Sequence, residues 1–190
     1  NMILDMKVQG SKENQLFYEY QKFTQIKGIE AQPLKNQLKT LEKDTRKYDK
    51  IKKQVEEIDD EVTDFKLDYM QQHFSTFFVK LLSAMEPIVV PESPLLEDGT
   101  VDSKFQYNYY KKHYWDLFDL KDDRMVRTPI FHGKMEKYLL EYTPQIPDSI
   151  IKSLDVLIEK VRESEALFKY VINWSTHHFE SSKIMGQDAV

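Results

Sequence analysis

Apolar residues recur at spacings of three and four through a long stretch that contains neither proline nor glycine. The stretch lies between Pro33 and Pro87, and its periodic part covers residues 34–70. The steps alternate between four and three, with one extra step of three, which is the near-heptad pattern of a coiled-coil-like helix. The repeating positions are Leu34, Leu38, Leu41, Thr45, Tyr48, Ile51, Val55, Ile58, Val62, Phe65 and Tyr69. The pattern predicts one long charged helix or a helical hairpin.

A single helix over residues 34–70 would be long for a molecule of this size. At about 1.5 Å per residue it would extend roughly 55 Å. A compact globule of the same chain length is only about 40 Å across. Such a helix must therefore bend, protrude or find a partner.

The charges along this stretch are sorted by sign. Residues 35–53 hold eight basic and three acidic side chains, whereas residues 56–68 hold seven acidic side chains and one lysine. Two copies lying antiparallel would place the basic half of each against the acidic half of the other, and would cover the apolar seam. We therefore predict an antiparallel homodimer through residues 34–70, with packing inside one chain as the alternative.

Proline, glycine and capping residues divide the rest of the chain. Residues 1–10 fit an extended arm or the tail of a preceding domain. Residues 11–86 hold the N-terminal helices, the first of which is expected to end at Gly28. Residues 87–101 contain three prolines and an Asp-Gly pair, which indicates an extended crossover. Residues 102–190 fit a helical bundle, and we expect 11–190 to form one structural domain.

Capping residues mark the helices within the last part of the chain. Thr128 is followed by proline and suits the N-cap of a helix. Asp148 and Ser164 are candidate N-caps of two further helices, and Gly186 is the expected end of the last one. The predicted fold class is therefore all-α, a helical bundle with a long charged coiled-coil-like helix or helical hairpin.

Composition agrees with a helical protein and narrows its partners. The 190 residues are 41% hydrophobic and 31% charged, and the 5 glycines and 7 prolines are too few for the turns of a many-stranded sandwich. A net charge of −5 disfavours non-specific nucleic-acid binding. No window approaches the roughly 18 apolar residues of a transmembrane helix. We therefore predict neither nucleic acid as a partner nor a transmembrane segment.

Recognisable catalytic motifs are missing from the sequence. It contains no cysteine, which excludes a disulfide scaffold, a thiol nucleophile and a redox motif within it. Its five histidines show no metal-ligand spacing, and it has no nucleophile elbow, glycine-rich phosphate loop or Walker lysine. Acidic pairs such as Asp122-Asp123 and Asp59-Asp60 lie among lysines and fit solvated faces or caps. We therefore predict a chain that is not an enzyme, with no catalytic residue, no metal and no cofactor.

The densest chemical feature is an aromatic run over residues 105–118, in which half of the side chains are aromatic. Tyr and Trp rings provide large contact areas and need hydrogen-bond partners, so the run fits either a core or a binding surface, with core packing favoured. Two arginines follow three residues apart and could clamp a carboxylate or form salt bridges to neighbouring aspartates. The candidate ligand or client surface comprises Tyr109, Tyr110, Trp115, Arg124 and Arg127.

An ordered set of short motifs in the second half of the chain carries a family resemblance. The motifs are Val101-Asp102-Ser103, Phe105-Gln106-Tyr107, Tyr109-Tyr110-Lys111, His113-Tyr114-Trp115-Asp116, Arg124, Arg127-Thr128-Pro129-Ile130-Phe131-His132, Pro144-Gln145, Pro147-Asp148-Ser149-Ile150 and Ser182-Lys183-Ile184-Met185-Gly186. In this order they resemble a helical domain of unknown function that occurs in Gram-negative cell-envelope thioredoxin-like proteins, the thiol–disulfide oxidoreductase group. In those proteins the helical domain lies upstream of the thioredoxin fold.

The resemblance implies a parent protein with an export or lipoprotein signal, a small β-rich domain, this helical region and a thioredoxin fold carrying Cys-x-x-Cys. It implies a location in the cell envelope or periplasm, and a thioredoxin-like partner domain on the same polypeptide. No cysteine is present to which the catalytic pair could be assigned. The resemblance therefore favours a non-catalytic helical accessory domain that positions or dimerises the redox domain, or presents a client surface.

Two other functions fit the same residues. One is a free-standing coiled-coil interaction protein without a redox connection, which depends on the heptad pattern. The other is a helical ligand-binding domain that uses the aromatic segment 105–118 with Arg124 and Arg127, which depends on accessible aromatic rings.

Overall fold

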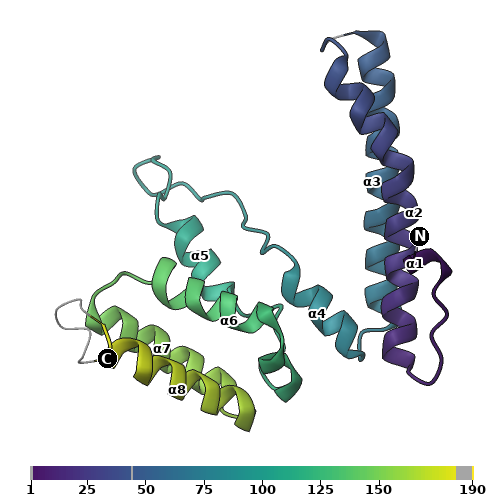
Figure 1. The fold of residues 1–190 in the computed structure, drawn as a ribbon. Coiled ribbons are helices and arrows are strands. Elements are labelled where there is room, and N and C mark those ends of the chain that lie inside the picture. Colours follow the sequence, from purple (N-terminus) through teal and green to yellow (C-terminus); the bar gives the residue numbers. More distant parts are fainter. Residues whose placement is uncertain (1, 44, 183–189) are drawn as a thin grey trace. The chain divides into compact units, whose positions relative to one another are not determined.

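The structure of this protein, a computed structural model, describes residues 2–43, 45–182 and 190. These residues form helices joined by turns and loops (Figure 1). Within the same residues, β-structure is limited to an isolated antiparallel bridge between Leu95 and Val101. The all-α fold class predicted from the apolar spacing is confirmed. No helix in the described part of the chain combines the length and the apolar character that a membrane span requires.

The chain divides into two compact units, Asn1–Leu82 and Ser83–Val190. This division differs from the single domain expected over residues 11–190. The sequence gives no sign of the boundary, because helix α4 (Phe77–Met85) runs through it without a proline, a glycine or a change of composition. Each unit is described by itself below.

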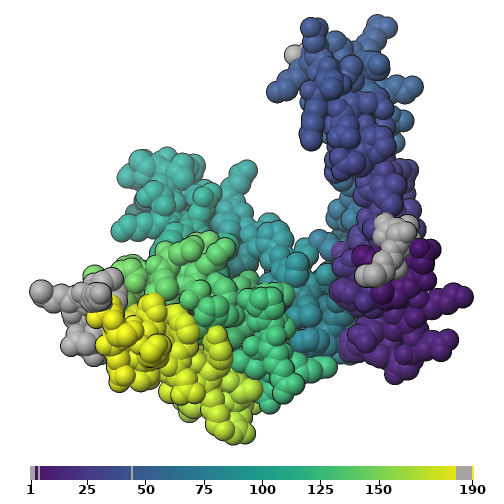
Figure 2. Space-filling view, viewed as in Figure 1, coloured from purple at the N-terminus to yellow at the C-terminus, as the bar shows by residue number. Residues whose placement is uncertain are grey.

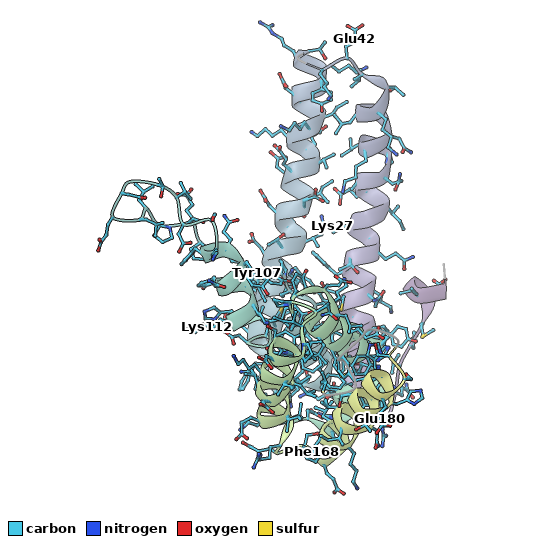
Figure 3. All side chains as sticks on the ribbon, turned by 90° about the vertical axis from the view of Figure 1, so that its left-hand side faces the viewer. Lys27, Glu42, Tyr107, Lys112, Phe168 and Glu180 are labelled. Carbon is cyan, nitrogen blue, oxygen red and sulfur yellow. The ribbon has the colours of Figure 1, made fainter. Side chains whose placement is uncertain are left out.

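A helical hairpin forms most of the first unit. Helices α2 (Lys12–Thr40) and α3 (Arg46–Gln72) lie side by side and antiparallel (Figure 1). Glu42 marks the end where α2 turns into α3, and Lys27 lies further down α2 (Figure 3). In the space-filling view, the half of the hairpin nearest this turn is a slender column made by the two helices alone (Figure 2).

Of the two predicted forms, one continuous helix over residues 34–70 or a helical hairpin, the structure has the hairpin. The chain turns after Thr40, and Thr45 caps α3 by accepting a hydrogen bond at Oγ1 from the backbone N–H of Tyr48, at 3.2 Å. Folding back places the predicted apolar seam inside the hairpin, where Ile51 and Val55 are buried. A solitary helix of that length would have left this seam in water, at a cost that grows with the exposed apolar area.

The predicted helix end at Gly28 is also wrong, because α2 continues to Thr40 with Pro33 inside it. Glycine in a helix costs only about 1 kcal/mol relative to alanine, and packing of α2 against α3 outweighs it. Pro33 removes the hydrogen bond to the carbonyl of Ile29. Both residues lie on the exposed side of α2, where water can solvate that carbonyl.

The arm predicted over residues 1–10 is only partly extended. Met2–Asp5 forms a short helix, α1, and residues 6–11 follow without regular structure. Gln15 on α2 donates from Nε2 to the carbonyl oxygen of Val8 at 3.3 Å, which ties this segment to the hairpin. The four residues of α1 are too few for the spacing of apolar side chains to distinguish a helical turn from a strand.

An aromatic cluster holds the base of the hairpin to α4. The hydroxyl of Tyr69 donates to the carbonyl oxygen of Leu16 at 2.7 Å, joining α3 to α2 across a buried interface. The ring of Phe65 stacks on that of Phe23 with centroids 3.8 Å apart. The buried members of the cluster are Leu16, Tyr69, Phe78 and Leu82.

Glu13, in the first turn of α2, caps the N-terminus of α4. Its two carboxylate oxygens accept the backbone N–H groups of Phe77 and Phe78 at 3.0 and 3.2 Å. These N–H groups have no partner within their own helix, and a carboxylate also interacts favourably with the positive end of the helix dipole. Glu13 therefore ties two segments more than 60 positions apart in the sequence.

Replacing Glu13 with alanine should lower the free energy of unfolding of the first unit by about 1–2 kcal/mol, the usual value of a helix cap. The measurement is urea unfolding followed by far-UV circular dichroism. The matched control is Glu19→Gln, at an exposed position on the same helix, which should change the midpoint little. A Glu13→Ala midpoint equal to that of the control would contradict the capping role.

The second unit contains the remaining helices. Residues 87–101, predicted as an extended crossover, form a loop with Gly99 at φ +80° and the Asp98 carboxylate accepting the Thr100 N–H at 2.9 Å. After it come α5 (Phe105–His113), the 3₁₀ helix η1 (Asp123–Arg127), α6 (Pro129–Glu136), the π-helical turn η2 (Lys137–Glu141), α7 (Pro147–Val161) and α8 (Glu165–Glu180). Helices α7 and α8 lie side by side and antiparallel (Figure 1). The side chains without exposed surface include Met125, Phe131, Met135, Leu139, Ile150, Leu157, Val161, Leu167 and Val171.

Two of the predicted helix starts are confirmed in this unit. Thr128 directly precedes α6, with Pro129 as its first residue. Ser164 is the N-cap of α8, and its Oγ accepts the N–H of Leu167 at 3.2 Å. Helix α7 begins at Pro147, one residue before the predicted cap Asp148. The predicted end at Gly186 lies outside the described residues.

Candidate functional site

The aromatic run splits into a buried part and a partly accessible part. Trp115, predicted as a surface residue, is only 3% exposed, and Phe118 is buried beside it. Their rings meet edge to face with centroids 5.7 Å apart, and both contact Phe131 of α6. The C-terminal part of the run is therefore core, as the favoured interpretation predicted, and Trp115 is no surface platform.

Tyr109 and Tyr110 lie on α5 and are half-buried. The Tyr109 ring packs on the His113 ring at a centroid distance of 4.2 Å. The Tyr110 ring packs on Tyr142 at 5.0 Å, and the hydroxyl of Tyr107 donates to the Tyr142 carbonyl oxygen at 2.7 Å. The contacts of Tyr107 and Tyr110 attach α5 to the residue that follows η2, and both Tyr109 and Tyr110 keep part of their surface exposed.

Arg124 forms an ion pair within the chain, which is the predicted alternative to clamping the carboxylate of a ligand. Its Nε and Nη2 atoms donate to the two carboxylate oxygens of Asp122 at 2.8 and 2.6 Å. The pair fixes the entrance to η1, where the Asp122 carboxylate also accepts the Arg124 N–H at 3.1 Å. Arg127 is exposed one 3₁₀ turn later. A bidentate clamp by both arginines would require Arg124 to leave Asp122.

The second unit has a cavity that the sequence did not reveal. It has a volume of about 320 Å³ and lies between the end of the aromatic run and the C-terminal part of α7. Of the five predicted surface residues, only Trp115 lines it. The other lining residues are Phe118, Asp119, Leu120, Lys121, Glu159, Lys160 and Glu163. The sequence carries no signal for this site, because its two segments are separated by almost 40 positions and neither contains a recognisable motif.

Buried tyrosines surround the contact between α5 and α6. Burial raises the pKa of Tyr114 and of Tyr138 above the ordinary value of 10.0. Burial also raises the pKa of Tyr110, assisted by a hydrogen bond to Tyr142. Lys134 lies over the Tyr114 ring, with Nζ 4.9 Å from the centroid, and its burial lowers its pKa. The cluster thus keeps its hydroxyls neutral and disfavours charge within it.

These pKa shifts predict a loss of stability at alkaline pH. A tyrosine whose pKa is raised by folding stays protonated in the native state while it ionises in the unfolded state, so its contribution is complete below about pH 10 and falls as the pH rises above that value. The urea midpoint should therefore decrease between about pH 9 and 11. Tyr114→Phe should flatten this decrease, whereas Tyr107→Phe, at an exposed position, should not. Equal slopes in both variants would contradict the assignment.

The histidines of the second unit make hydrogen bonds and ring contacts. His113 Nδ1 lies 2.6 Å from an Asp116 carboxylate oxygen. His132 contacts the Tyr170 hydroxyl at 2.9 Å and Glu136 at 3.3 Å. In the described ranges, no three His, Asp or Glu side chains gather closely enough to hold a metal ion. The ring of His178 stacks on Trp174 with centroids 4.6 Å apart.

Two ion pairs join the helices of the hairpin within one chain. Lys27 pairs with Glu61, and Lys35 pairs with Asp59 at 3.2 Å, each joining α2 to α3. Both carboxylates are exposed, so each pair adds little to stability. Their role is to fix the register of the two helices more than to stabilise them.

Comparison with known proteins places the chain in a family. Residues 40–190 match the family described as "Domain of unknown function (DUF5106)". The chain belongs to this family. No curated protein and no solved structure matches it. The DUF5106 match covers α3, α4 and the whole second unit but starts at the last residue of α2. The structural unit therefore extends beyond the matched region, because α2 covers the apolar seam of α3.

Proposed function

We propose that this chain is a non-catalytic helical domain of an exported thioredoxin-family thiol–disulfide oxidoreductase of the cell envelope. Its role would be to position the redox domain or to present a surface to client proteins. The link to thioredoxin-like proteins is supported by the ordered motifs over residues 101–186 and agrees with membership of the DUF5106 family. The sequence contains no cysteine, so electron exchange through thiols would belong to the partner domain.

Exposed aliphatic side chains in the crossover carry the interaction role. Val89, Leu95 and Val101 are 83%, 69% and 60% exposed, and Leu96 beside them is also exposed. Loops normally present polar residues to water. A group of exposed aliphatic side chains in this loop would lose contact with water if another protein surface covered it, and such patches are typical of interaction sites. Hydrogen bonds within the loop, such as Leu96 N–H to the Thr100 carbonyl at 2.8 Å, hold these side chains in place before any partner binds.

The first test is the reading frame that encodes the chain. A Trp-Cys-x-x-Cys sequence within about 100 residues after Val190, the length of one typical domain, would support the proposal. A stop codon directly after Val190 would contradict it and would favour the free-standing interaction protein.

The second test separates positioning from catalysis. The full protein and its isolated thioredoxin domain should reduce a small aromatic disulfide at the same rate. Insulin serves as a probe of protein clients, and the full protein should reduce it at a rate that differs several-fold from that of the isolated domain. In the Leu95→Ser, Leu96→Ser double variant, this rate should return to that of the isolated domain. Equal rates for all proteins on both substrates would contradict a role in client presentation.

The antiparallel homodimer predicted through residues 34–70 stays a prediction, and its alternative, packing inside one chain, accounts for part of its basis. Packing of α3 against α2 buries Ile51, Val55 and Ile58 of the apolar seam and pairs Lys35 with Asp59. We therefore expect the chain to sediment as a monomer at tens of micromolar, at low and at high salt. A dimer that dissociates when salt is added would support the antiparallel arrangement instead, because screening weakens exposed ion pairs.

A further inference from the structure

The cavity lined by Trp115 has an apolar floor. Trp115, Phe118 and Leu120 are all at least nine-tenths buried and line a space of about 320 Å³. This volume lies in the range of small-molecule sites, which are mainly apolar with a few placed polar groups. The cavity thus resembles a binding site in size, with three apolar side chains in its lining and charged side chains beside them.

One of these lining residues, Trp115, has a buried polar group without a partner. The indole Nε1 of Trp115 is buried and has no hydrogen-bond acceptor. Buried donors are nearly always paired, and an exception requires an explanation such as a bound molecule. The indole N–H can only donate, so the missing partner must be a hydrogen-bond acceptor.

The rim of the cavity offers one cation that is not already paired in the described contacts. Lys121 pairs with Glu163 at 2.8 Å, and Glu159 pairs with Arg162 at 3.0 Å. Lys160 is exposed and has no ion-pair partner within the described part of the chain. Glu159 and Glu163 thus already have cationic partners, and the Asp119 carboxylate accepts the backbone N–H of Lys121 at 3.0 Å, while the Lys160 ammonium stays available to a ligand.

We propose that this cavity binds a small monocarboxylate with a compact apolar body. The apolar body lies on Trp115, Phe118 and Leu120, and one carboxylate oxygen pairs with the Lys160 ammonium. The second oxygen accepts the indole N–H of Trp115, after a small movement of the ring opens that atom to the cavity. This site lies wholly within the second unit and does not depend on the proposed interaction role.

The two tryptophans provide a direct readout of binding. The experiment titrates ¹⁵N-labelled protein with 4-methylpentanoate and follows the indole N–H resonances of Trp115 and Trp174, which the Trp174→Phe variant distinguishes. The Trp115 resonance should shift downfield and saturate, while that of Trp174 should stay in place. The absence of a saturable shift at Trp115 would overturn the proposal.

Variants test each polar contact separately. Lys160→Gln should weaken binding about three- to fivefold, as expected for an exposed ion pair, whereas Lys152→Gln, exposed on the same helix outside the cavity, should bind as the parent does. Trp115→Phe keeps an aromatic ring in the core and should weaken binding measured by calorimetry. Equal affinities for parent, Lys160→Gln and Trp115→Phe would overturn the assigned contacts.

A neutral analogue tests the class of ligand. The amide 4-methylpentanamide has the same apolar body and should bind several-fold more weakly, because it cannot form the ion pair with Lys160. Equal binding of the amide and the acid would overturn the carboxylate assignment, and would leave a cavity that recognises only the apolar body.

Discussion

Replacing Phe131 with alanine is expected to lower the free energy of unfolding of the second unit by about 3–5 kcal/mol, the range for removal of a fully buried phenylalanine. Phe131 has no exposed surface. Its ring contacts Phe118 and Tyr170, with centroids 5.7 Å away in each case, and Trp115 at 6.3 Å. It thereby joins the aromatic run to α6 and α8, and truncation would leave a cavity between three elements that cannot easily collapse.

Tryptophan fluorescence measures this loss in the correct unit. Both tryptophans of the chain, Trp115 and Trp174, lie in the second unit, so the fluorescence transition in urea reports its unfolding. The control is Phe74→Ala, because Phe74 is 76% exposed in the first unit and truncation there should change stability by less than about 0.5 kcal/mol. Similar midpoints for the two variants would show that the aromatic run is not the centre of the core.

Replacing Tyr69 with alanine should cost the first unit about 3–5 kcal/mol, as for other large buried aromatic residues. The Tyr69 ring packs within 6.4 Å of the rings of Tyr20, Phe65 and Phe78. Its hydroxyl joins α3 to the Leu16 carbonyl of α2. The variant therefore loses both the ring contacts at the base of the hairpin and the hydrogen bond that joins the two helices.

Tyr69→Phe separates these two effects. It keeps the ring and removes the hydroxyl, so it should cost only about 0.5–1.5 kcal/mol, the net value of one hydrogen bond. Far-UV circular dichroism reports both units and fluorescence only the second, so a change confined to the dichroism transition identifies the first unit. A Tyr69→Phe loss as large as that of Tyr69→Ala would show that the hydroxyl, and not the ring, holds the hairpin together.

Helix positions were predictable wherever a local signal sufficed. Ser164 was identified as an N-cap because a serine before an apolar helix start can accept a backbone N–H within the same turn. Thr128 was identified because a proline at the first position of a helix loses no hydrogen bond. Both signals act over three or four residues and need no knowledge of the rest of the chain.

Helix ends within the hairpin were not predictable in this way. Gly28 and Pro33 are local stop signals, yet α2 passes through both. The turn after Thr40 contains neither glycine nor proline in its described residues. In both cases packing between α2 and α3 decides, and helical stability in proteins comes mainly from the burial of an apolar face.

The candidate site shows the same limit. The aromatic run could be read from the sequence as core or surface, but its division into a buried end at Trp115 and a half-accessible start at Tyr109 depends on the position of α6. The pairing of Arg124 with Asp122 was open as an alternative, since the two residues are neighbours. The cavity beside Lys160 required the meeting of two distant segments and had no counterpart in the sequence pattern.

Periodicity and composition were enough to show that this protein is helical and lacks cysteine, and short motifs indicated its family. These properties depend on periodicity, composition and short motifs, which are local. Three features came from long-range contacts alone: the long apolar seam closes on α2, Glu13 caps α4, and Trp115, with its unpaired indole N–H, lines a cavity. Those features depend on contacts between residues far apart in the chain. Many different pairings of the helices could bury their apolar faces equally well, so the sequence pattern does not select one of them.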